Sequence, residues 1–572
     1  MIYLGVHNSS QAGAALIKDG KIIGAVTEER FNRIKNYHGW PQKSIDYLLD
    51  LANITLKNVD KIVYGMFTDT TPRGFEFNVI KDRIKKDVDK IPEFKNIYYE
   101  RLQSEIEWNI KHKKELTDWA EKNSVADKIN YLDHHMSHAA GAHFTSPFEK
   151  SMTFTCDGKG NFKSSAVFVG DGKYLDMMDY QTTFDSIGYF YGNVTKALGF
   201  QPERHEGKVT GLAAYGNHLI FNHFNDVLKF NHDTGQIELQ IGKYYLPWFV
   251  GEEYLPILHK EVQQHKKEDV AAAAQYVVEK AITEWITWHI KKNCDSPTDV
   301  CLSGGIFANV KLNQKIKELW EVKEVYVQPA MGDMGIPLGS CLAQMEKDDN
   351  SYKKFEKSMA LGPSFSSKEI KTYLDKNNIK YNKVKSLEED VAQLIDNGNI
   401  IGYFSGKMEY GPRALCNRSI IYHCRDKSVN DWLNKRLNRT EFMPFAPVTT
   451  DKLADKCFHN WSTKDHAADF MTMTYKVTDN FAKTCPAAVH VDNTARPQVI
   501  RKGVNDKMYN IITHYHNTRG DLALINTSFN NHEEPIVCNI EDALDSLNKN
   551  NVDVLVIENF IIYGKDNIRN TK

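Results

Sequence analysis

Three histidines stand within five positions in the stretch DHHMSHAAGAHF, residues 133–144. His134 and His138 are four residues apart, so on a helix their side chains leave the same face and can bind one metal ion. With 21 histidines in 572 residues, random placement gives roughly one pair at this spacing, and the chain has one. The pair alone therefore leaves two interpretations open, a metal site or a histidine-rich polar helix edge.

Two glycine turns in the first half could hold nucleotide phosphates, CDGKG at 156–160 and SGGIFAN at 303–309. Glycine lets backbone N–H groups approach an anion, and a following helix adds its positive N-terminus. Each is equally consistent with an ordinary turn. The stretch MGDMG adds Asp333 in a similar setting, and Asp157 and Asp333 could complete a His2Asp2 site with the two histidines. This ligand mixture suits Fe(II), Zn(II) or Mn(II).

The second half presents several arginines beside hydroxyl and amide groups. EYGPRALCNRS contains Arg413 and Arg418, TARPQ contains Arg496, and NTSFNNHEEP offers Ser528 and Asn530 after a predicted strand. Such groups suit bidentate recognition of a phosphate or carboxylate. A single arginine of this kind is more often part of a surface salt bridge, so an anion site and surface pairs both stay open here.

The elements that must position these residues alternate between strands and helices, which indicates an α/β protein. Residues 1–30 are predicted to form strands with a hairpin turn at Asp19-Gly20, followed by a helix after Pro41. Residues 151–175 are predicted to form a strand pair with turns at Asp157-Gly158 and Asp171-Gly172. The longest predicted helix is DVAAAAQYVVEKAITEWITWHIKKN, with an apolar stripe that faces the core. The polar stretch 347–357 is the best candidate for a linker.

Composition narrows the class of protein. Hydrophobic residues make up 41% and charged residues 26%, as in ordinary globular proteins. A net charge of −2 supplies no overall field that would recruit nucleic acid or an anionic membrane. Nine cysteines without any CxxC pattern suit a reducing compartment, and neither a signal peptide nor a long apolar stretch is evident, so we expect a cytoplasmic protein that does not span a membrane.

Nine motifs follow one another over nearly the whole chain: AGAALIKDGKIIGAVTEERFNRIKN, DHHMSHAAGAHFTSPF, HEGKVTGLAAYG, LSGGIFANVKLN, VQPAMGDMGIPLG, MEYGPRALCNRS, MPFAPV, TARPQ and NTSFNNHEEPIV. Together they resemble the O-carbamoyltransferase family of nodulation and antibiotic-tailoring enzymes. The resemblance implies a Kae1-like domain with an actin/hexokinase-like duplicated fold over residues 1–346. A linker over 347–360 and a YrdC-like α/β domain over 361–572 would follow.

The resemblance also implies a two-step reaction. The YrdC-like domain would convert carbamoyl phosphate and ATP, with Mg2+, into carbamoyl adenylate and pyrophosphate. A hydroxyl of an acceptor would then attack this intermediate in the Kae1-like domain, which would hold Fe(II) or another divalent ion, and AMP would leave. Family acceptors are sugars or natural products. A hydroxymethylated nucleobase, free or in DNA, is an alternative, with the aromatic and basic segment 96–114 as its contact. A homodimer is compatible with this family.

The family's functional residues carry over to matching positions. The metal ligands would be His134, His138, Asp157 and Asp333. His135 matches no ligand and would lie beside the ligands or at the surface. The nucleotide or adenylate would contact Gly158, Lys208, Gly304, Gly305 and Asn309. Carbamoyl phosphate and ATP would contact Arg413, Arg418, Arg496, Ser528 and Asn530.

The chain departs from the family pattern near the acceptor. A His-Asp pair of the family is replaced by Ser10-Gln11, and His7 lies three residues earlier. HEGK places Glu206 where an aspartate is common, and a glutamate reaches one methylene further. Serine and glutamine cannot accept a proton near neutral pH, so we expect Glu206 to be the principal base. His7 would orient the acceptor or the metal ligands.

A second departure concerns the phosphate pocket. Leu437 and Met443 occupy positions where the family has a lysine and an arginine. The missing charge would come from one of three neighbours, Lys435, Arg436 or Arg439.

Two other functions stay open as alternatives. One is a threonylcarbamoyl transferase of tRNA modification, which shares both domain types. The other is a non-catalytic, actin-like nucleotide-binding scaffold, which the departures at Leu437 and Met443 would suit.

Overall fold

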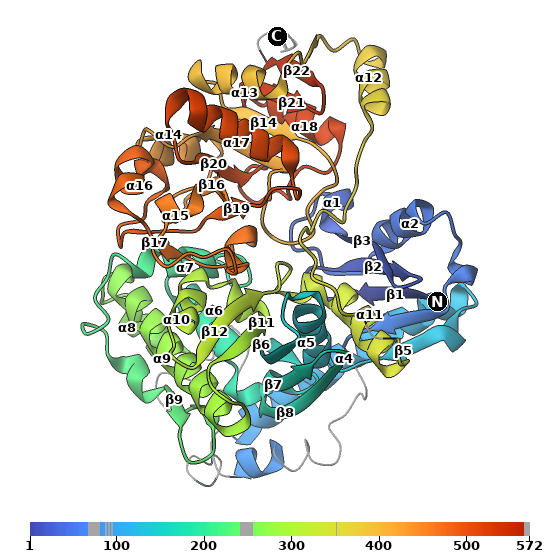
Figure 1. The fold of residues 1–572 in the computed structure, drawn as a ribbon. Coiled ribbons are helices and arrows are strands. Elements are labelled where there is room, and N and C mark those ends of the chain that lie inside the picture. The colour runs from blue at the N-terminus through green and yellow to red at the C-terminus, as the bar shows by residue number, and fades with distance from the viewer. Residues whose placement is uncertain are drawn as a thin grey trace. The chain divides into compact units, whose positions relative to one another are not determined.

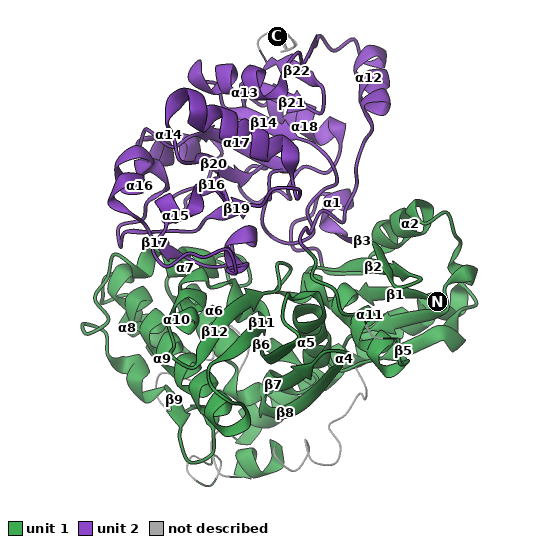
Figure 2. Cartoon of the chain, in the orientation of Figure 1, with its two compact units in different colours: residues 1–23, 38–356 green, residues 24–37, 357–572 purple. Residues whose placement is uncertain are grey.

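The computed structural model describes residues 1–66, 80–85, 89, 92, 95–240, 255–350 and 352–564. The chain forms two compact units (Figure 2), residues 1–23 with 38–356 and residues 24–37 with 357–572. The functional division at 346 and 361 stays a prediction. The compact units differ from it because residues 24–37 pack with the second unit.

The first sheet of unit 1 has the order β3-β2-β1-β4-β5 (Figure 1). Its strands are β1 (Ile2–His7), β2 (Gly13–Lys18), β3 (Lys21–Thr27), β4 (Lys61–Tyr64) and β5 (Ile129–Tyr131). β1 is antiparallel to β2 and parallel to β4, and β4 is parallel to β5. Asp19 and Gly20 have φ angles of 51° and 71°, which fit the predicted hairpin turn.

The second sheet of unit 1 repeats this topology with the order β8-β7-β6-β11-β12. Its strands are β6 (Lys150–Gly160), β7 (Lys163–Asp171), β8 (Tyr174–Thr182), β11 (Thr298–Ser303) and β12 (Val322–Val327). β6 is antiparallel to β7 and parallel to β11, which is parallel to β12. Each sheet thus has a first strand at its centre, an antiparallel side and a parallel side, although no repeat is evident in the sequence.

The turn predicted at Asp157-Gly158 is wrong. β6 continues through these residues to Gly160, and the chain reverses at Asn161 and Phe162, whose φ angles are 53° and 61°. A two-residue hairpin of the favoured twist needs positive φ at both central positions, and these two residues adopt it. The turn predicted at Asp171-Gly172 is present, with φ of 59° at Gly172.

Two helices that follow the last strand of each sheet pack against one another, α5 (His134–Thr145) after β5 and α11 (Ile336–Lys347) after β12. A Cβ atom at Gly339 would lie 1.9 Å from the Ser137 carbonyl oxygen, so the close crossing requires glycine. The other long helices of unit 1 are α2 (Gln42–Leu51), α4 (Lys95–Lys122), α6 (Ile187–Ala197), α7 (Glu206–Ala213), α8 (Pro256–Val262), α9 (Lys267–Asn293) and α10 (Val310–Lys317). The apolar stripe predicted on α9 is buried.

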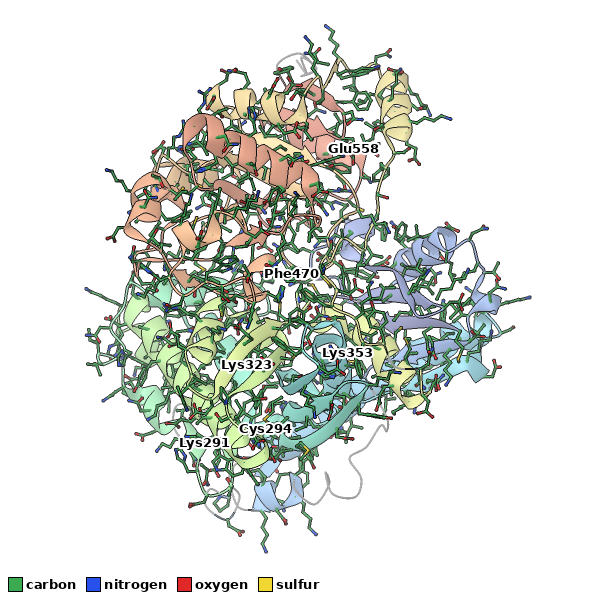
Figure 3. The ribbon with its side chains drawn as sticks, viewed as in Figure 1. Lys291, Cys294, Lys323, Lys353, Phe470 and Glu558 are labelled. Atoms are coloured by element: carbon green, nitrogen blue, oxygen red, sulfur yellow. The ribbon has the colours of Figure 1, made fainter. Side chains whose placement is uncertain are left out.

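The end of unit 1 is anchored by a lysine from the stretch predicted as a linker. The Lys353 ammonium group (Figure 3) donates to the carbonyls of His143 and Ser146 over 3.1 and 2.9 Å. Tyr352 beside it is 6% exposed. Residues 352–356 therefore belong structurally to unit 1.

Unit 2 contains an eight-stranded sheet with the order β13-β22-β21-β14-β15-β20-β16-β19. Its strands are β13 (Asn382–Lys383), β14 (Ile401–Phe404), β15 (Arg418–His423), β16 (Ala446–Thr450), β19 (Gln498–Ile500), β20 (Leu524–Ser528), β21 (Val554–Ile557) and β22 (Phe560–Tyr563). Alternate residues enter two separate cores: Tyr403 and Val556 one, Phe404 and Leu555 the other. Burial of both faces explains why these strands are continuously apolar.

The helices of unit 2 supply the rest of both cores. α13 (Leu387–Asp396) and α17 (Asp506–Arg519) contribute to one core. α12 (Ser367–Lys376), α14 (Val429–Arg436) and α18 (Ile540–Asn548) contribute to the other. The whole chain is therefore a mixed α/β protein, as predicted. Within the described residues, no helix is long and apolar enough to cross a membrane.

Candidate active site

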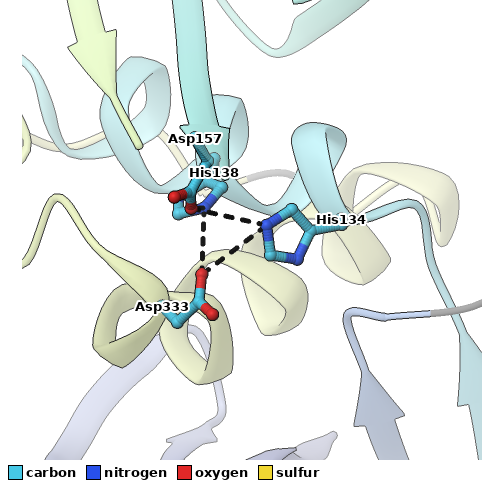
Figure 4. A group of neighbouring side chains, drawn as sticks. All are labelled: His134, His138, Asp157 and Asp333. Carbon is cyan, nitrogen blue, oxygen red and sulfur yellow. Dashed lines mark hydrogen bonds and ion pairs between the residues drawn. The ribbon is translucent and has the colours of Figure 1, made fainter. Parts of the chain in front are cut away.

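Four side chains converge in unit 1 near the carboxyl ends of its strands (Figure 4). His134 and His138 come from α5 directly after β5, and Asp157 lies near the end of β6. Asp333 begins the short 3-10 helix η8 (Asp333–Gly335), which follows β12. The carboxyl ends of parallel strands are where α/β proteins most often bind ligands. The structure thus brings together the four residues predicted as metal ligands.

The start of α5 is fixed by its N-cap residue. The Asp133 side chain accepts a hydrogen bond from the Met136 backbone N–H and pairs with Lys163 at 3.0 Å. Burial alone would raise the pKa of Asp133, but the charge of Lys163 lowers it, so this carboxylate stays ionised. The His134 N–H donates to the Asn161 side chain over 2.9 Å. These bonds set the position of the two histidines.

The distances within the cluster are short. His138 Nε2 lies 3.0 Å from Asp157 Oδ2 and 3.6 Å from Asp333 Oδ1. His134 Nε2 lies 3.7 and 3.6 Å from the same two oxygens. His138 Nδ1 is 3.2 Å from the Ser303 hydroxyl, a contact that fixes the orientation of the ring.

The electrostatics of the cluster indicate that it lacks positive charge. Burial alone would lower the pKa of His138, but its bonds with Asp157 and Asp333 raise it to about 9. Burial also opposes ionisation of both carboxyls, yet the neighbouring histidines hold their pKa values below the ordinary range. Two ionised carboxylates therefore share one small site, and a proton on His138 partly compensates them.

The donor set fits a divalent metal ion. His134 is fully buried, and neither ring nitrogen has a hydrogen-bond partner within the described residues. Ligands about 2.1 Å from one ion lie roughly 3–3.4 Å apart, close to the spacing observed here. Two imidazoles and two carboxylates suit Fe(II), Zn(II) or Mn(II). The identity of these residues as metal ligands stays a prediction.

His135 is buried beside the cluster, so the alternative of a surface position is wrong. Its exposed fraction is 0%, and Nδ1 is 2.9 Å from the Thr155 hydroxyl. Burial, with the nearby charge of His134, lowers the pKa of His135 to about 3, so it is neutral. Its ring packs edge-on against that of His134, with ring centroids 5.4 Å apart, and so restricts the movement of the His134 ring.

His7 lies on the other side of Asp333. Its Nε2 donates to the Ser10 carbonyl over 3.0 Å and is 3.7 Å from Asp333 Oδ2. Gln11, which stands in the departing Ser10-Gln11 pair, accepts from the Met334 N–H through its side-chain oxygen at 3.2 Å. Both residues therefore contact the Asp333 loop.

The glycine turn after β11 packs against the Asp157 segment. Gly304 has φ of 101°, and a Cβ atom there would lie 2.2 Å from the Cys156 carbonyl oxygen, so only glycine fits. A Cβ at Gly305 would lie 3.0 Å from Asp157 Oδ1. Gly158 contacts the Tyr189 ring. The predicted nucleotide-binding glycines thus lie within contact distance of the metal-ligand cluster.

Asn309 and Lys208 have structural surroundings of their own. Asn309 caps α10 by accepting from the Leu312 N–H, and its amide donates to Gln275 on α9 over 2.8 Å. Lys208 is buried in α7, with 4% exposed. Their predicted contacts with a nucleotide stay predictions.

Glu206 begins α7 and has the character of a base. Burial raises the pKa of its carboxyl to about 7, although the Glu203 N–H donates to it over 2.7 Å. A carboxyl that exchanges its proton near neutral pH is suited to general base catalysis. The raised pKa supports the role of Glu206 as the principal base. That role stays a prediction.

In unit 2, Arg413 and Arg496 lie close enough for their charges to interact. Burial lowers the pKa of both groups, and the charge of Arg413 helps to lower that of Arg496 to about 9. The Nε atom of each is buried without a hydrogen-bond partner among the described residues. The exposed Glu441 is the nearby acidic group that partly offsets them. Guanidinium groups in such surroundings suit recognition of an anion, and the predicted phosphate contacts of both residues stay predictions.

Comparison with known proteins decides the family. Residues 3–342 match the carbamoyltransferase N-terminus model and residues 392–563 the carbamoyltransferase C-terminus model. The chain belongs to the carbamoyltransferase family. It is 30% identical to the uncharacterized protein MJ1051 of Methanocaldococcus jannaschii, over 98% of this chain and 99% of that protein. The nodulation protein NolNO of Sinorhizobium fredii is 29% identical, over 96% of this chain and 78% of that protein.

These matches confirm the resemblance to nodulation-type carbamoyltransferases and identify a transferase. Among solved structures, HypF in its phosphate- and nucleotide-bound form has a TM-score of 0.32 and 13% identity, over 61% of this chain and 56% of that one. That similarity is too low to support a conclusion about function.

Arg418 of this carbamoyltransferase, predicted to contact carbamoyl phosphate and ATP, is bound by backbone carbonyls. Its guanidinium is fully buried and donates to the backbone carbonyls of Pro363, Ser405, Gly406 and Asn417. It also stacks on the Phe404 ring at 3.6 Å. Because its two terminal nitrogens donate to backbone carbonyls, Arg418 holds the loop that carries Arg413. Its predicted contact with carbamoyl phosphate or ATP stays a prediction.

Arg439 is the neighbour that supplies charge near Ser528 and Asn530. Its guanidinium donates to the side chains of Thr527, Ser528 and Asn530 over 2.7, 3.2 and 2.8 Å. Burial lowers its pKa to about 10.

The other two candidates for the missing charge lie elsewhere. Arg436 pairs with Asp553, and Lys435 is exposed. Leu437 is fully buried in the core of unit 2, where no charge could be accommodated.

Lys35 is a residue that sequence reasoning missed. It belongs to the segment 24–37 of unit 2, and burial lowers its pKa. The charged groups that act on it next are Glu533, Glu29, Arg439 and Glu441. It therefore lies beside the Arg439 region. The basic residues of the motif TEERFNRIKN are the sequence feature that could have identified Lys35.

Unit 2 also contains a cavity of about 330 Å3. Its lining residues include Ser405, Glu409, Asn417, Arg501 and Lys507. Arg501 is engaged with Asp469 at 2.7 Å. The predicted phosphate-binding residues Arg413, Arg496, Ser528 and Asn530 are not among the residues that line this cavity.

Proposed function

We propose that this carbamoyltransferase is an ATP-dependent O-carbamoyltransferase that works in two steps. Unit 2 first hydrolyses carbamoyl phosphate to carbamate and phosphate, which consumes one water. A carbamate oxygen then attacks the α-phosphate of ATP, so that carbamoyl adenylate forms and pyrophosphate leaves. Unit 1 then transfers the carbamoyl group to a hydroxyl of an acceptor and releases AMP. Carbamoyl phosphate, ATP and Mg2+ as its companion ion are part of this proposal.

The observation that carries the proposal is the pair of arginines in unit 2. Arg413 and Arg496 are like charges in one partly buried site, and their buried Nε atoms have no hydrogen-bond partner among the residues that the structure describes. Such an arrangement is costly unless an anion enters it. Phosphate groups of carbamoyl phosphate and ATP supply that anion, and planar guanidinium groups bind them in a fixed orientation.

Arg439, Ser528 and Asn530 complete this pocket in the proposal. The guanidinium of Arg439 is oriented by Ser528 and Asn530, so these two act on the substrate partly through Arg439. Lys35 adds a further positive charge from the segment 24–37. Together the four cations would neutralise the negative charge that gathers as pyrophosphate leaves.

In unit 1, His134, His138, Asp157 and Asp333 would hold the metal ion, which we propose to be Fe(II) or another divalent ion. When bound, the ion supplies positive charge that polarises the departing phosphate. Ser303 keeps His138 in the orientation needed, and His7 and Gln11 hold the Asp333 loop. The absence of a side chain at Gly158, Gly304 and Gly305 leaves room for backbone N–H groups to approach the adenylate. Lys208 of the motif HEGK and Asn309 of the motif SGGIFAN would contact it as well.

Glu206 would take the proton from the acceptor hydroxyl as that oxygen attacks the carbamoyl carbon. A hydroxyl has a pKa far above 7, so a positioned base is required. The pKa of about 7 leaves a large fraction of Glu206 ionised at neutral pH while retaining basicity. His7 acts as a positioning residue, because its contacts are with Ser10 and Asp333.

The repeated strand order of unit 1 supports the actin/hexokinase-like, Kae1-like part of the proposal. The YrdC-like assignment of unit 2 rests on the motifs. Threonylcarbamoyl transfer to tRNA is the weaker alternative because both carbamoyltransferase models match this chain. The alternative of a non-catalytic scaffold is set aside because the family is one of transferases.

The acceptor is proposed to be a small hydroxyl-bearing molecule. The segment 96–114, considered as a contact for a nucleobase, lies in α4, whose buried face includes Arg101 and Glu105 at 3.0 Å. Arg101 also donates to the Thr183 hydroxyl. Of the aromatic and basic residues in this segment, Tyr98, Arg101 and His112 are buried and so pack α4 against unit 1.

The test is to measure pyrophosphate release from ATP with and without carbamoyl phosphate, and to screen a panel of sugar and natural-product hydroxyls by mass for the added carbamoyl group. Pyrophosphate release that depends on carbamoyl phosphate supports the proposal. Release without carbamoyl phosphate, or transfer of threonylcarbamoyl to tRNA, contradicts it.

A further inference from the structure

A second group of metal-binding side chains occurs in unit 1, outside the site described above. His223 lies at the start of the 3-10 helix η5 (His223–Asp226), Glu261 lies in α8, and His265 follows α8. One ligand atom from each residue lies within 4.8 Å of the others. No part of the proposed carbamoyl transfer uses these three residues.

Local backbone structure sets Glu261 and His265 on the same side. The Gln264 N–H donates to the Glu261 carbonyl and the His265 N–H to the Val262 carbonyl, over 3.0 and 3.2 Å. These two turn bonds reverse the chain just after the end of α8. The turn brings the side-chain ligand atoms of Glu261 and His265 within 4.8 Å of one another.

A buried phenylalanine holds the two imidazoles. Phe221 is fully buried, and its ring centroid lies 4.7 Å from that of His223 and 5.0 Å from that of His265. Phe221 is itself packed on Phe224 at 5.0 Å. Because the apolar core restricts both rings, little further ordering is needed when an ion binds.

The ligand chemistry points to a transition metal. Two imidazoles and one carboxylate suit Zn2+ and ions of similar preference, whereas Mg2+ and Ca2+ favour sites built from oxygen ligands. All three residues are half-buried, so water can complete the coordination. Three protein ligands with open positions accessible to water are a recognised arrangement for Zn2+.

We propose that His223, Glu261 and His265 form a second transition-metal site, which binds Zn2+ and joins η5 to α8. An ion held there would connect segments that are close in space but 38 residues or more apart in the chain. Its role is to stabilise this part of unit 1, and it is independent of the carbamoyl transfer proposed above.

The test uses the full chain with His138→Ala as background, so that binding at the other cluster does not obscure the result. Metal-depleted protein is titrated with Zn2+ in competition with a chromogenic chelator. We expect His138→Ala to bind one Zn2+ and the double variant with His265→Ala to bind none. Zn2+ should raise the thermal unfolding temperature of the single variant only, because an ion that binds the folded state stabilises it.

Two further variants separate a lost ligand from a damaged fold. Glu261→Gln keeps the side-chain shape and should weaken Zn2+ binding by more than about tenfold, the least that loss of even an outer partner costs. His232→Ala, an exposed histidine outside the cluster, should leave binding unchanged. Retention of one Zn2+ by the double variant, no Zn2+ in His138→Ala alone, or equally tight binding of Mg2+ would overturn the proposal.

Discussion

The two charged clusters of this carbamoyltransferase are incomplete in opposite senses. In unit 1, Asp157 and Asp333 concentrate negative charge beside His134, whose ring nitrogens have no hydrogen-bond partner among the described residues. In unit 2, Arg413 and Arg496 concentrate positive charge, and within the described part of the chain their Nε atoms have no hydrogen-bond partner either. One cluster therefore calls for a cation and the other for an anion. The contrast suggests that two chemical steps are separated because each needs its own electrostatic environment.

The largest effect should come from the cation-binding cluster. His138→Ala removes the histidine that contacts both carboxylates and lies closest to Asp157, so carbamoyl transfer to any acceptor should fall below detection while pyrophosphate release continues. Product mass and pyrophosphate are measured in parallel. His143→Gln changes a buried histidine on the same helix that contacts Ser151 instead, and it should retain transfer. Equal loss of both steps in His138→Ala would contradict the separation of the two clusters.

A smaller effect is expected for the base. Glu206→Gln should slow transfer by ~10²–10⁴-fold and leave adenylate formation intact, since only the second step needs a proton acceptor. Wild-type transfer should rise as the pH passes the Glu206 pKa of about 7, because the ionised carboxylate is the active form. The variant should lose this rise.

His7→Ala is the companion variant and should slow transfer less than Glu206→Gln does. The same pair of variants therefore tests the assignment of roles. If Glu206→Gln transfers at the wild-type rate and His7→Ala is inactive, His7 is the base.

The anion-binding cluster should respond by about 10–100-fold. Arg496→Ala removes one charge-assisted donor worth roughly 1.5–3 kcal/mol, so pyrophosphate release at subsaturating carbamoyl phosphate should decrease accordingly. Supplied carbamoyl adenylate should restore transfer. Arg425→Ala serves as the control because that side chain is 42% exposed and pairs with Asp521. Normal pyrophosphate release in Arg496→Ala would remove the contrast between the clusters.

The smallest effect on catalysis is expected for Arg418. Arg418→Met keeps the volume but leaves buried carbonyls without donors, so thermal unfolding should occur at a lower temperature. The KM for carbamoyl phosphate, measured well below the unfolding temperature, should change less than threefold, on the order of experimental scatter for a residue that does not touch substrate. A large rise in KM with unchanged stability would return Arg418 to the anion pocket.

The unit 1 cluster could be predicted from the sequence more fully than the unit 2 cluster. His134 and His138 share a helix, Asp157 lies near the end of a strand and Asp333 follows one, so spacing and strand ends identify them. The hairpin turn predicted at Asp157-Gly158 is wrong, because Asn161 and Phe162 adopt the positive φ angles instead.

In unit 2 the charged side chains come from separate loops, and sequence cannot tell which donors the backbone engages. Arg418 and Arg439 look alike in the sequence, yet one is bound by four carbonyls and the other reaches Ser528 and Asn530. The joining of Lys35 to unit 2 depends on contacts far apart in the chain.

The repeated topology of unit 1 has a mechanical consequence. His7 and Asp157 lie at the ends of the first strands of the two sheets, and His134 and Asp333 follow the last strands. Each pair thus joins corresponding places in two halves of one unit. Bending between the halves would change the distances among these side chains directly, and an ion bound by His134, Asp157 and Asp333 would resist that bending. The site is therefore most rigid when the ion is bound, so binding of the ion would also make the two halves of unit 1 harder to bend against one another.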